Sequence, residues 1–340
     1  MSKVPQSNDL TISKIDRNEL EISYTFPNKF TIKDADGNTY LFEPLEQTKT
    51  KSVTPSTWYE LWYTSSYYLT KIILNNKREM LFKYEEEVTI EYEFQRSQRY
   101  IDGSLRAVEN SPIAYVSPST HQTVYTRLLT GISSDNANIN FHYNLEREDL
   151  RGDRALTSVD VYNFDNTLIK KIDLEYEFVS ADVCPSGVSS YTCKRLFLKS
   201  IKETNGDESL PPYKFEYDQT SLPQRNSFEQ DDWGFFNDSN AISGIPKIFV
   251  YPTSSRAGER YLTFPKPGSS TSIILDGADK SVNPLKVQAG ILKKITYPTG
   301  GTMSVEYESN QFLWFSEASS NVQDAYNITG GGVRVKRMTL

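Results

Sequence analysis

The chain has very little of the side chains that most often carry out chemistry. Its 340 residues include only two histidines, two cysteines and four methionines. No apolar run approaches the ~20 residues that a membrane-spanning helix needs. Lys and Arg (37) are outnumbered by Asp and Glu (44), and the net charge of −7 argues against a nucleic-acid-binding protein, because phosphates require a basic face. Residues 1–20 are polar and carry no signal peptide.

The two histidines match no catalytic or metal-binding motif. His142 lies in an alternating stretch whose apolar residues take the odd positions, so we expect it on the solvent face. His121 lies in a Ser/Thr/Pro-rich stretch that predicts a loop, and neither spacing suits a metal site or a triad. Gly330-Gly331-Gly332 precedes a strand and not a helix that could hold phosphate. We therefore expect no catalytic residues, no metal and no cofactor.

Cys184 and Cys193 enclose a short Ser-rich stretch. A metal site would need further ligands, and the sequence offers none nearby. Two interpretations stay open. The pair forms a disulfide that closes a surface loop if the protein is exported, or it is a pair of free thiols.

Aromatic residues are abundant, with 22 Tyr and 17 Phe. Many of them belong to a sequence motif that occurs five times, which we call the repeated phrase. A Leu, followed three residues later by Ile or Val, opens a strand; a polar turn follows, and the return strand ends on an alternating run with a Tyr. This pattern is typical of β-hairpins with turns of different length. The copies run from Leu69 to Tyr84, Leu129 to Tyr143, Leu156 to Tyr176, Leu198 to Tyr217 and Leu292 to Tyr307.

These repeats predict an all-β, mostly antiparallel meander of consecutive hairpins that forms a large curled sheet with long loops and little helix. The copies are unevenly spaced, so a solenoid of fixed period does not fit. We expect one continuous β-rich segment of a longer protein, because a new strand begins at Met338-Thr339-Leu340. Its parts are N-terminal hairpins at 1–97, a loop at 98–122, central hairpins at 123–218, an irregular aromatic, Pro- and Gly-rich insertion at 219–289, and a C-terminal hairpin at 290–340.

Two aromatic clusters are candidate functional sites. The first is Asp231-Asp232-Trp233-Gly234-Phe235-Phe236-Asn237, and the second lies between Trp58 and Tyr68. Acids beside aromatics are found in sugar-binding clefts, and paired carboxylates hydrolyse glycosides. The interpretation that we favour is structural: Trp233, Phe235 and Phe236 fill a corner of the sheet, while Asp231 or Asn237 caps backbone groups.

Several of these stretches, taken in order, resemble the region that precedes the repeat core in large Rhs/YD-repeat proteins of Bacteroidetes type. One departure is Asp238, where a Gly usually follows the Trp-Gly-aromatic-aromatic-Asn run. The matching stretches are Phe30-Thr31-Ile32, Tyr68-Leu69-Thr70-Lys71-Ile72, Lys214-Phe215-Glu216-Tyr217, residues 231–237, 277–284 and 288–301, and Gly331-Gly332-Val333-Arg334-Val335-Lys336.

The resemblance implies a secreted or cell-surface β-shell protein that wraps a cargo. Its partners would be the remaining repeat core and a C-terminal effector or toxin domain of the same polypeptide, and this segment would be a non-catalytic scaffold. An alternative is a carbohydrate-binding or adhesion module that contacts cell-surface glycan through exposed aromatic clusters. A further alternative is a glycan-cleaving enzyme that uses Asp231 or Asp232. Burial separates the first two, because the aromatics of a binding module lie exposed.

Overall fold

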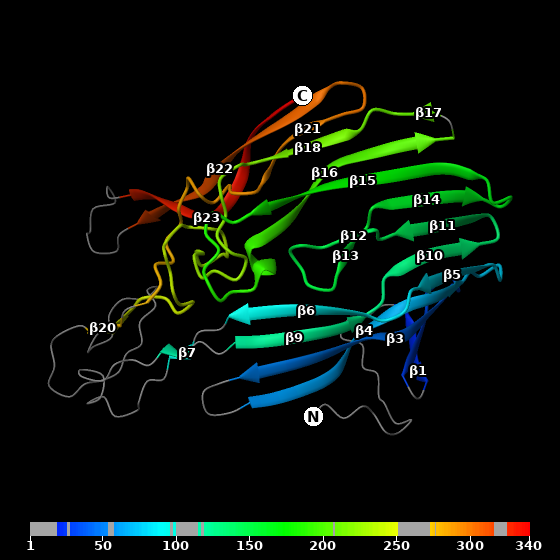
Figure 1. Ribbon diagram of the computed structural model, residues 1–340, viewed down its shortest axis with the longest axis horizontal. Coiled ribbons are helices and arrows are strands. Elements are labelled where there is room, and N and C mark those ends of the chain that lie inside the picture. Colours follow the sequence, from blue (N-terminus) through cyan, green and yellow to red (C-terminus); the bar gives the residue numbers. More distant parts are fainter. Residues whose placement is uncertain are drawn as a thin grey trace.

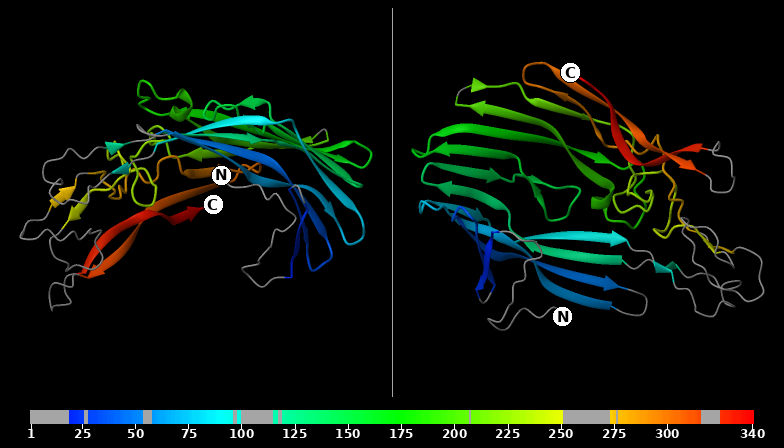
Figure 2. Two further views of the ribbon diagram at one scale, coloured as in Figure 1. Left: turned by 90° about the horizontal axis from the view of Figure 1, so that it is seen from below. Right: turned by 180° about the vertical axis from the view of Figure 1, so that it is seen from behind.

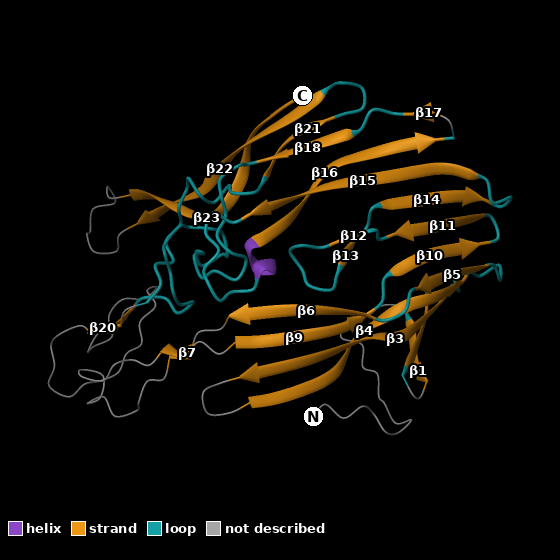
Figure 3. Ribbon diagram, viewed as in Figure 1, coloured by secondary structure: helices purple, strands orange, loops and turns teal. Residues whose placement is uncertain are grey.

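The computed structural model describes residues 19–25, 28–53, 58–95, 98–99, 115–116, 119–206, 208–250, 273–275, 277–315 and 325–340. Within these ranges the chain is almost entirely strand and turn, with one short 3₁₀-helix, η1 (Ser190–Cys193), shown in Figure 3. The predicted all-β, antiparallel fold is confirmed.

The strands follow one another along the chain with mostly short connections. Those of the first half are β1 (Glu21–Thr25), β2 (Lys29–Lys33), β3 (Thr39–Val53), β4 (Trp58–Ile73), β5 (Glu79–Tyr84), β6 (Val88–Gln95), β7 (Gln98–Arg99), β8 (Tyr115–Val116), β9 (Ser119–Thr126), β10 (Leu129–Ser134), β11 (Ala137–His142), β12 (Leu145–Glu146) and β13 (Arg154–Ala155). Those of the second half are β14 (Ser158–Asn163), β15 (Leu168–Ser180), β16 (Lys194–Asn205), β17 (Glu208–Ser209), β18 (Tyr213–Tyr217), β19 (Ile248–Val250), β20 (Ile273–Leu275), β21 (Leu292–Thr296), β22 (Thr302–Phe315) and β23 (Ala325–Thr339).

Seventeen strands form one sheet. Its neighbours run β1-β2-β3-β4-β5-β10-β11-β14-β15-β16-β18-β21-β22-β23, so the sheet follows the chain from the blue to the red end of Figure 1. Strands β9 and β6 form a side branch on β3. The irregular segment that follows β18 contributes the small β19–β20 pair outside the sheet.

All five predicted hairpins are present, and four share one hydrogen bond that links the first and last residues of the repeated phrase. The Tyr hydroxyl donates to the backbone carbonyl of the Leu that opens the same phrase, at 2.8 Å in each case. The pairs are Tyr84 to Leu69, Tyr176 to Leu156, Tyr217 to Leu198 and Tyr307 to Leu292. We call this contact the Tyr–Leu clamp, and it explains why the phrase ends on Tyr and not on Phe.

The β3–β9 branch is the main departure from a simple meander. One edge of β3 pairs with β2 over Thr39–Phe42 and with β9 over Gln47–Val53. Consequently, the predicted loop at 98–122 ends earlier than expected, and His121 lies in β9 and not in a loop. The sequence expectation failed because the pairing joins residues that are 66 (Val53 and Ser119) to 78 (Gln47 and Tyr125) positions apart, and no local turn signal marks such a contact.

Glu46 lies where β3 changes partner, next to two register shifts. Its carboxylate accepts hydrogen bonds of 2.6–2.9 Å from the hydroxyls of Ser65, Ser66, Tyr68 and Thr126. Burial raises the pKa of Glu46, but these four bonds outweigh it and hold the pKa below its ordinary value. Burial and the Glu46 contact together raise the pKa of Tyr68 to about 12.

The sheet is a single curved layer. In Figure 2 it forms an arch whose two ends, β1–β3 and β22–β23, bend toward the same side. In the described part of the chain no large side chain is fully buried. A chain of this length in a two-layer domain would enclose a large core. Among the described residues, the buried apolar ones are only Ile90, Leu150, Ala155, Cys193, Ala278, Val287 and Val305.

Candidate functional site

The 231–237 cluster is a tight turn organised by a buried acid. Asp231 is 3% exposed, and its Oδ1 accepts the backbone N–H groups of Trp233 (2.9 Å) and Phe235 (3.0 Å). Its own N–H donates to the Phe235 carbonyl at 2.8 Å. Gly234 has φ of +88°, a conformation that glycine adopts without strain. Oδ1 of Asp231 is thus occupied with the turn, whereas Oδ2 is buried and has no hydrogen-bond partner among the described residues.

Three consecutive glycines of β23 support three aromatic rings. A Cβ atom on Gly331 would lie 2.1 Å from the Trp233 indole, so the indole rests directly on the Gly331 backbone. On the neighbouring glycines a Cβ would lie 3.4 Å from a ring, that of Phe312 for Gly330 and that of Phe235 for Gly332. We call Gly330, Gly331 and Gly332 the glycine triplet. It lies inside a strand, and it fastens the irregular segment to the sheet.

Trp233 is nevertheless 61% exposed. The expectation that its indole is buried is therefore wrong, because the indole packs with one face on the glycine triplet and most of the residue stays exposed. Phe235 and Phe236 are half-buried. Lys286 lies over the Phe236 ring, with Nζ 5.8 Å from the ring centroid, and also pairs with Asp238 at 2.9 Å.

Asn237 is 5% exposed and joins two distant parts of the irregular segment. Its Nδ2 donates to the carbonyls of Asp279 (2.9 Å) and Ser281 (3.1 Å), and its own carbonyl accepts a bond from Asn283 at 3.1 Å. Both Asp231 and Asn237 therefore bind backbone groups through their side chains, as the sequence predicted for one or the other.

The second aromatic cluster also presents rings to solvent. Tyr59 is 53% and Trp62 is 46% exposed. The Trp62 ring stacks against Tyr125, with centroids 5.3 Å apart, and Lys49 Nζ lies 5.2 Å from the same ring. Each cluster therefore has aromatic side chains that are exposed and not part of a buried core: Trp233 in the first, and Tyr59 and Trp62 in the second.

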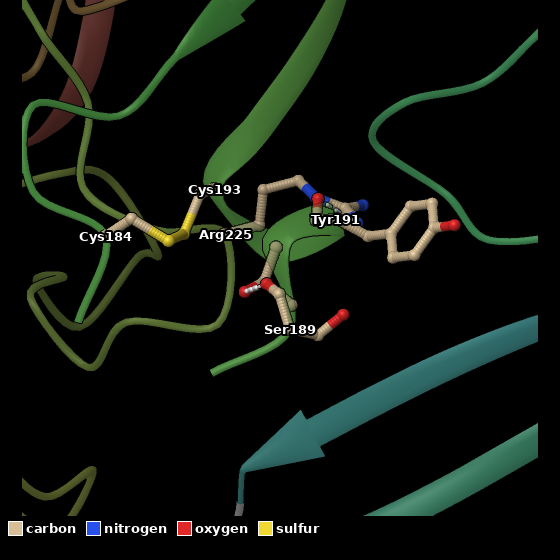
Figure 4. The surroundings of a disulfide bond; sticks show 6 residues. Cys184, Ser189, Tyr191, Cys193 and Arg225 are labelled. Atoms are coloured by element: carbon tan, nitrogen blue, oxygen red, sulfur yellow. Dashed lines mark hydrogen bonds between the residues drawn. A yellow bond between two sulfur atoms is a disulfide. The ribbon is translucent and has the colours of Figure 1, made fainter. Parts of the chain in front are cut away.

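Cys184 and Cys193 form a disulfide at the start of β16 (Figure 4). The disulfide holds η1, and the Arg225 backbone N–H donates to the Thr192 carbonyl of that helix at 2.8 Å. The Arg225 guanidinium also donates to the carbonyls of Tyr191 (3.2 Å) and Asp149. Figure 4 shows the Tyr191 ring directed away from the disulfide.

A cavity with a volume of about 420 Å³ lies between this corner and β6. It is lined by residues of β6 and β9, of η1 and its flank, and of two loops: Glu91, Tyr92, Glu93, Phe94, His121, Leu150, Arg151, Ser189, Tyr191, Thr192, Arg225, Asn226, Ser227, Phe228 and Gln230. No sequence pattern predicted this cavity or the contacts of Arg225 and Phe312. The glycine triplet was the available signal for the Phe312 contact, because strand glycines often mark the close approach of other groups.

No group of three or more His, Cys, Asp or Glu in the described ranges is placed to hold a metal ion. Across the same part of the chain, no helix has the length and apolar character needed to cross a membrane. His142 is partly exposed and lies with Nε2 3.0 Å from Asp160.

No protein-family model and no curated protein matches the chain. Among solved structures, it is similar to a chain of a structure described as "Crystal Structure of TcdB2-TccC3-Cdc42", with 11% identity and a TM-score of 0.26. The similarity covers 61% of this chain and 12% of that one, so this chain corresponds to a small part of a much longer one. A TM-score this low supports no conclusion about fold or function.

Proposed function

We propose that this chain is a non-catalytic structural scaffold, one wall of the β-shell of a secreted or cell-surface Rhs/YD-repeat protein that encloses or presents a C-terminal effector domain. The observation that carries the proposal is the single curved layer with so few buried apolar side chains. A sheet with two open faces gains stability by covering one of them, and a cargo domain on the concave side of the arch would cover that face.

The edge of β23 that faces away from β22 also supports the proposal, because further strands of a longer polypeptide could continue the sheet there. Among the described strands β23 pairs only with β22, and every residue from Arg334 to Leu340 is exposed. Val335 (52%) and Met338 (54%) are among them. Arg334, Lys336 and Arg337 lie beside these apolar residues, and such charges protect an unpaired edge from aggregation. A further strand of the same shell would pair with the edge that β23 leaves open.

Limited proteolysis of the polypeptide as its host makes it tests this proposal. We expect a polypeptide with further strands and a C-terminal domain that resists protease while the shell is intact and becomes sensitive once the shell is opened by mild denaturant. A native polypeptide that lacks such a domain, or whose domain is cut equally fast in both conditions, would contradict the scaffold role.

The exposure of Trp233, Trp62 and Tyr59 favours a second candidate, the carbohydrate-binding module. Co-sedimentation with insoluble polysaccharides tests it, using the wild-type chain beside Trp233→Ala and Trp62→Ala. The module requires saturable binding that one of these changes abolishes, and the scaffold requires none. Assaying the supernatants for released sugar tests the glycan-cleaving alternative. We expect no product, because Asp231 is only 3% exposed and its Oδ1 is held by two backbone N–H groups.

A further inference from the structure

The cavity beside β6 lies along an open edge of the sheet. The Glu91 N–H donates to the Arg151 carbonyl at 3.0 Å, on the side of β6 away from β9. Because backbone groups alternate between the two edges of an antiparallel strand, Glu93 also directs its N–H and carbonyl away from β9. Within the described ranges, the Arg151 loop is the one backbone partner on this outer edge, at an isolated bridge. The edge at Glu93 therefore faces the cavity unpaired.

The opposite wall of the cavity is held in place. It consists of η1 and the loop that begins at Arg225, and the disulfide fixes η1. The Arg225 backbone and guanidinium bonds then fasten the loop to η1. The volume of about 420 Å³ thus lies between a strand edge and a rigid wall, which is the shape that accepts one more strand.

The lining side chains indicate what kind of strand fits. Phe94 (44% exposed), Tyr191 and Phe228 supply apolar surface. Glu93 is half-buried and forms no ion pair within the described part of the chain. The Asn226 Oδ1 is buried without a hydrogen-bond partner, so it offers an acceptor to an incoming donor.

We propose that this cleft binds an extended peptide by adding it as a strand to the outer edge of β6. Backbone hydrogen bonds to Glu93 supply the register. Successive side chains of a strand point to opposite faces, so an alternating peptide places a basic group at the Glu93 carboxylate and apolar groups against Phe94 and Phe228. The occupant is therefore a segment in which Lys or Arg alternates with apolar residues, and its binding does not depend on the scaffold role.

Fluorescence anisotropy with the full chain tests the proposal. The probe is a labelled, N-acetylated peptide of roughly seven residues in which valine alternates with lysine, which spans about 23 Å as a strand. Two further peptides are compared: one with N-methyl groups on alternate amides, which removes the backbone donors, and one with glutamate in place of lysine. The variants are Glu93→Lys and the matched control Glu87→Lys, an exposed residue in the turn before β6.

We expect saturable binding of the valine–lysine peptide, a loss of about tenfold or more in Glu93→Lys, and a change within about twofold in Glu87→Lys. The N-methylated and glutamate peptides should not bind. If the wild-type chain binds the N-methylated peptide as tightly as the unmodified valine–lysine peptide, strand addition is overturned. This result does not depend on whether the variants fold. Absence of saturation up to about 1 mM probe would overturn the site itself.

Discussion

Single residues decide how the irregular segment is attached to the sheet, and Trp233 on the glycine triplet is the clearest case. With 61% of the residue exposed, only one face of the indole contributes apolar burial. We expect Trp233→Ala to lower the free energy of unfolding by about 2 kcal/mol, less than the ~3–5 kcal/mol typical of a fully buried Trp. Urea unfolding followed by far-UV circular dichroism measures it.

The contact between Trp233 and Gly331 gives a second, sharper prediction. Gly331→Ala places a Cβ 2.1 Å from the indole, which must move, so the single change should destabilise the chain by a similar amount. In the Trp233→Ala background that clash is absent, and Gly331→Ala should be nearly neutral. Additive effects in this double-mutant cycle would show that the indole does not rest on Gly331.

Glu46 makes stability depend on acid pH. Its pKa in the folded chain is lowered by four hydroxyl hydrogen bonds, which outweigh the effect of burial. The stabilisation is therefore fully present above the pKa of an unfolded glutamate and is lost as the pH falls through the lower folded pKa. We expect Glu46→Gln to unfold more readily at pH 7 and to lose less stability than wild type between about pH 5 and 3. Parallel curves for the two proteins would contradict this role.

At the scale of elements, the Tyr–Leu clamp makes the hairpins alike although their turns differ. Burial raises the pKa of Tyr84, Tyr176 and Tyr217, so the neutral hydroxyl is the donor over a wide pH range. Tyr217→Phe removes the hydroxyl and leaves a part-buried carbonyl unpaired, and it should cost about 1–2 kcal/mol.

Tyr143 supplies the matched control for that change. It ends the one copy without a clamp, Leu129 to Tyr143, and is likewise half-buried, but no hydrogen bond of its hydroxyl is found among the described residues. Tyr143→Phe should therefore shift the urea midpoint far less than Tyr217→Phe does. Equal shifts would mean that ring packing, and not the clamp, accounts for the Tyr at the end of the phrase.

The disulfide between Cys184 and Cys193 stabilises η1, as the Tyr–Leu clamp stabilises the hairpins. It closes a loop of 9 residues in sequence separation, for which the loss of chain entropy predicts about 2–3 kcal/mol. We expect the Cys184→Ser/Cys193→Ser protein to melt lower than wild type, and a reductant to bring wild type down to the same midpoint. A reductant that moves the midpoint of the double variant too would point to a cause other than this bond.

The hairpins were predictable because each is local: alternation and a polar turn lie within one short stretch. The β3–β9 pairing was not, since it joins Gln47–Val53 to Ser119–Thr126. For Trp233, the sequence predicts a contact but not how much of the ring the contact covers. Its partner, the glycine triplet, lies almost 100 residues further along the chain, and only the folded sheet brings them together.

At the scale of the whole molecule, the described strands form a curved sheet, one layer thick, in which β23 pairs with β22 alone. The Tyr–Leu clamp ties the two strands of four hairpins together, in a sheet that has few buried apolar side chains among its described residues. In the proposed scaffold, the apolar residues that β23 exposes would contact the next part of the shell.

Hydrogen exchange at β23, compared between this chain and the native polypeptide, tests the scaffold claim most directly. Along Arg334–Thr339 about half of the amides of an edge strand point outward and exchange quickly in the isolated chain. We predict that the same amides are protected in the native polypeptide, because a further strand pairs with them. Equally fast exchange of these amides in the native polypeptide would contradict a continuing shell.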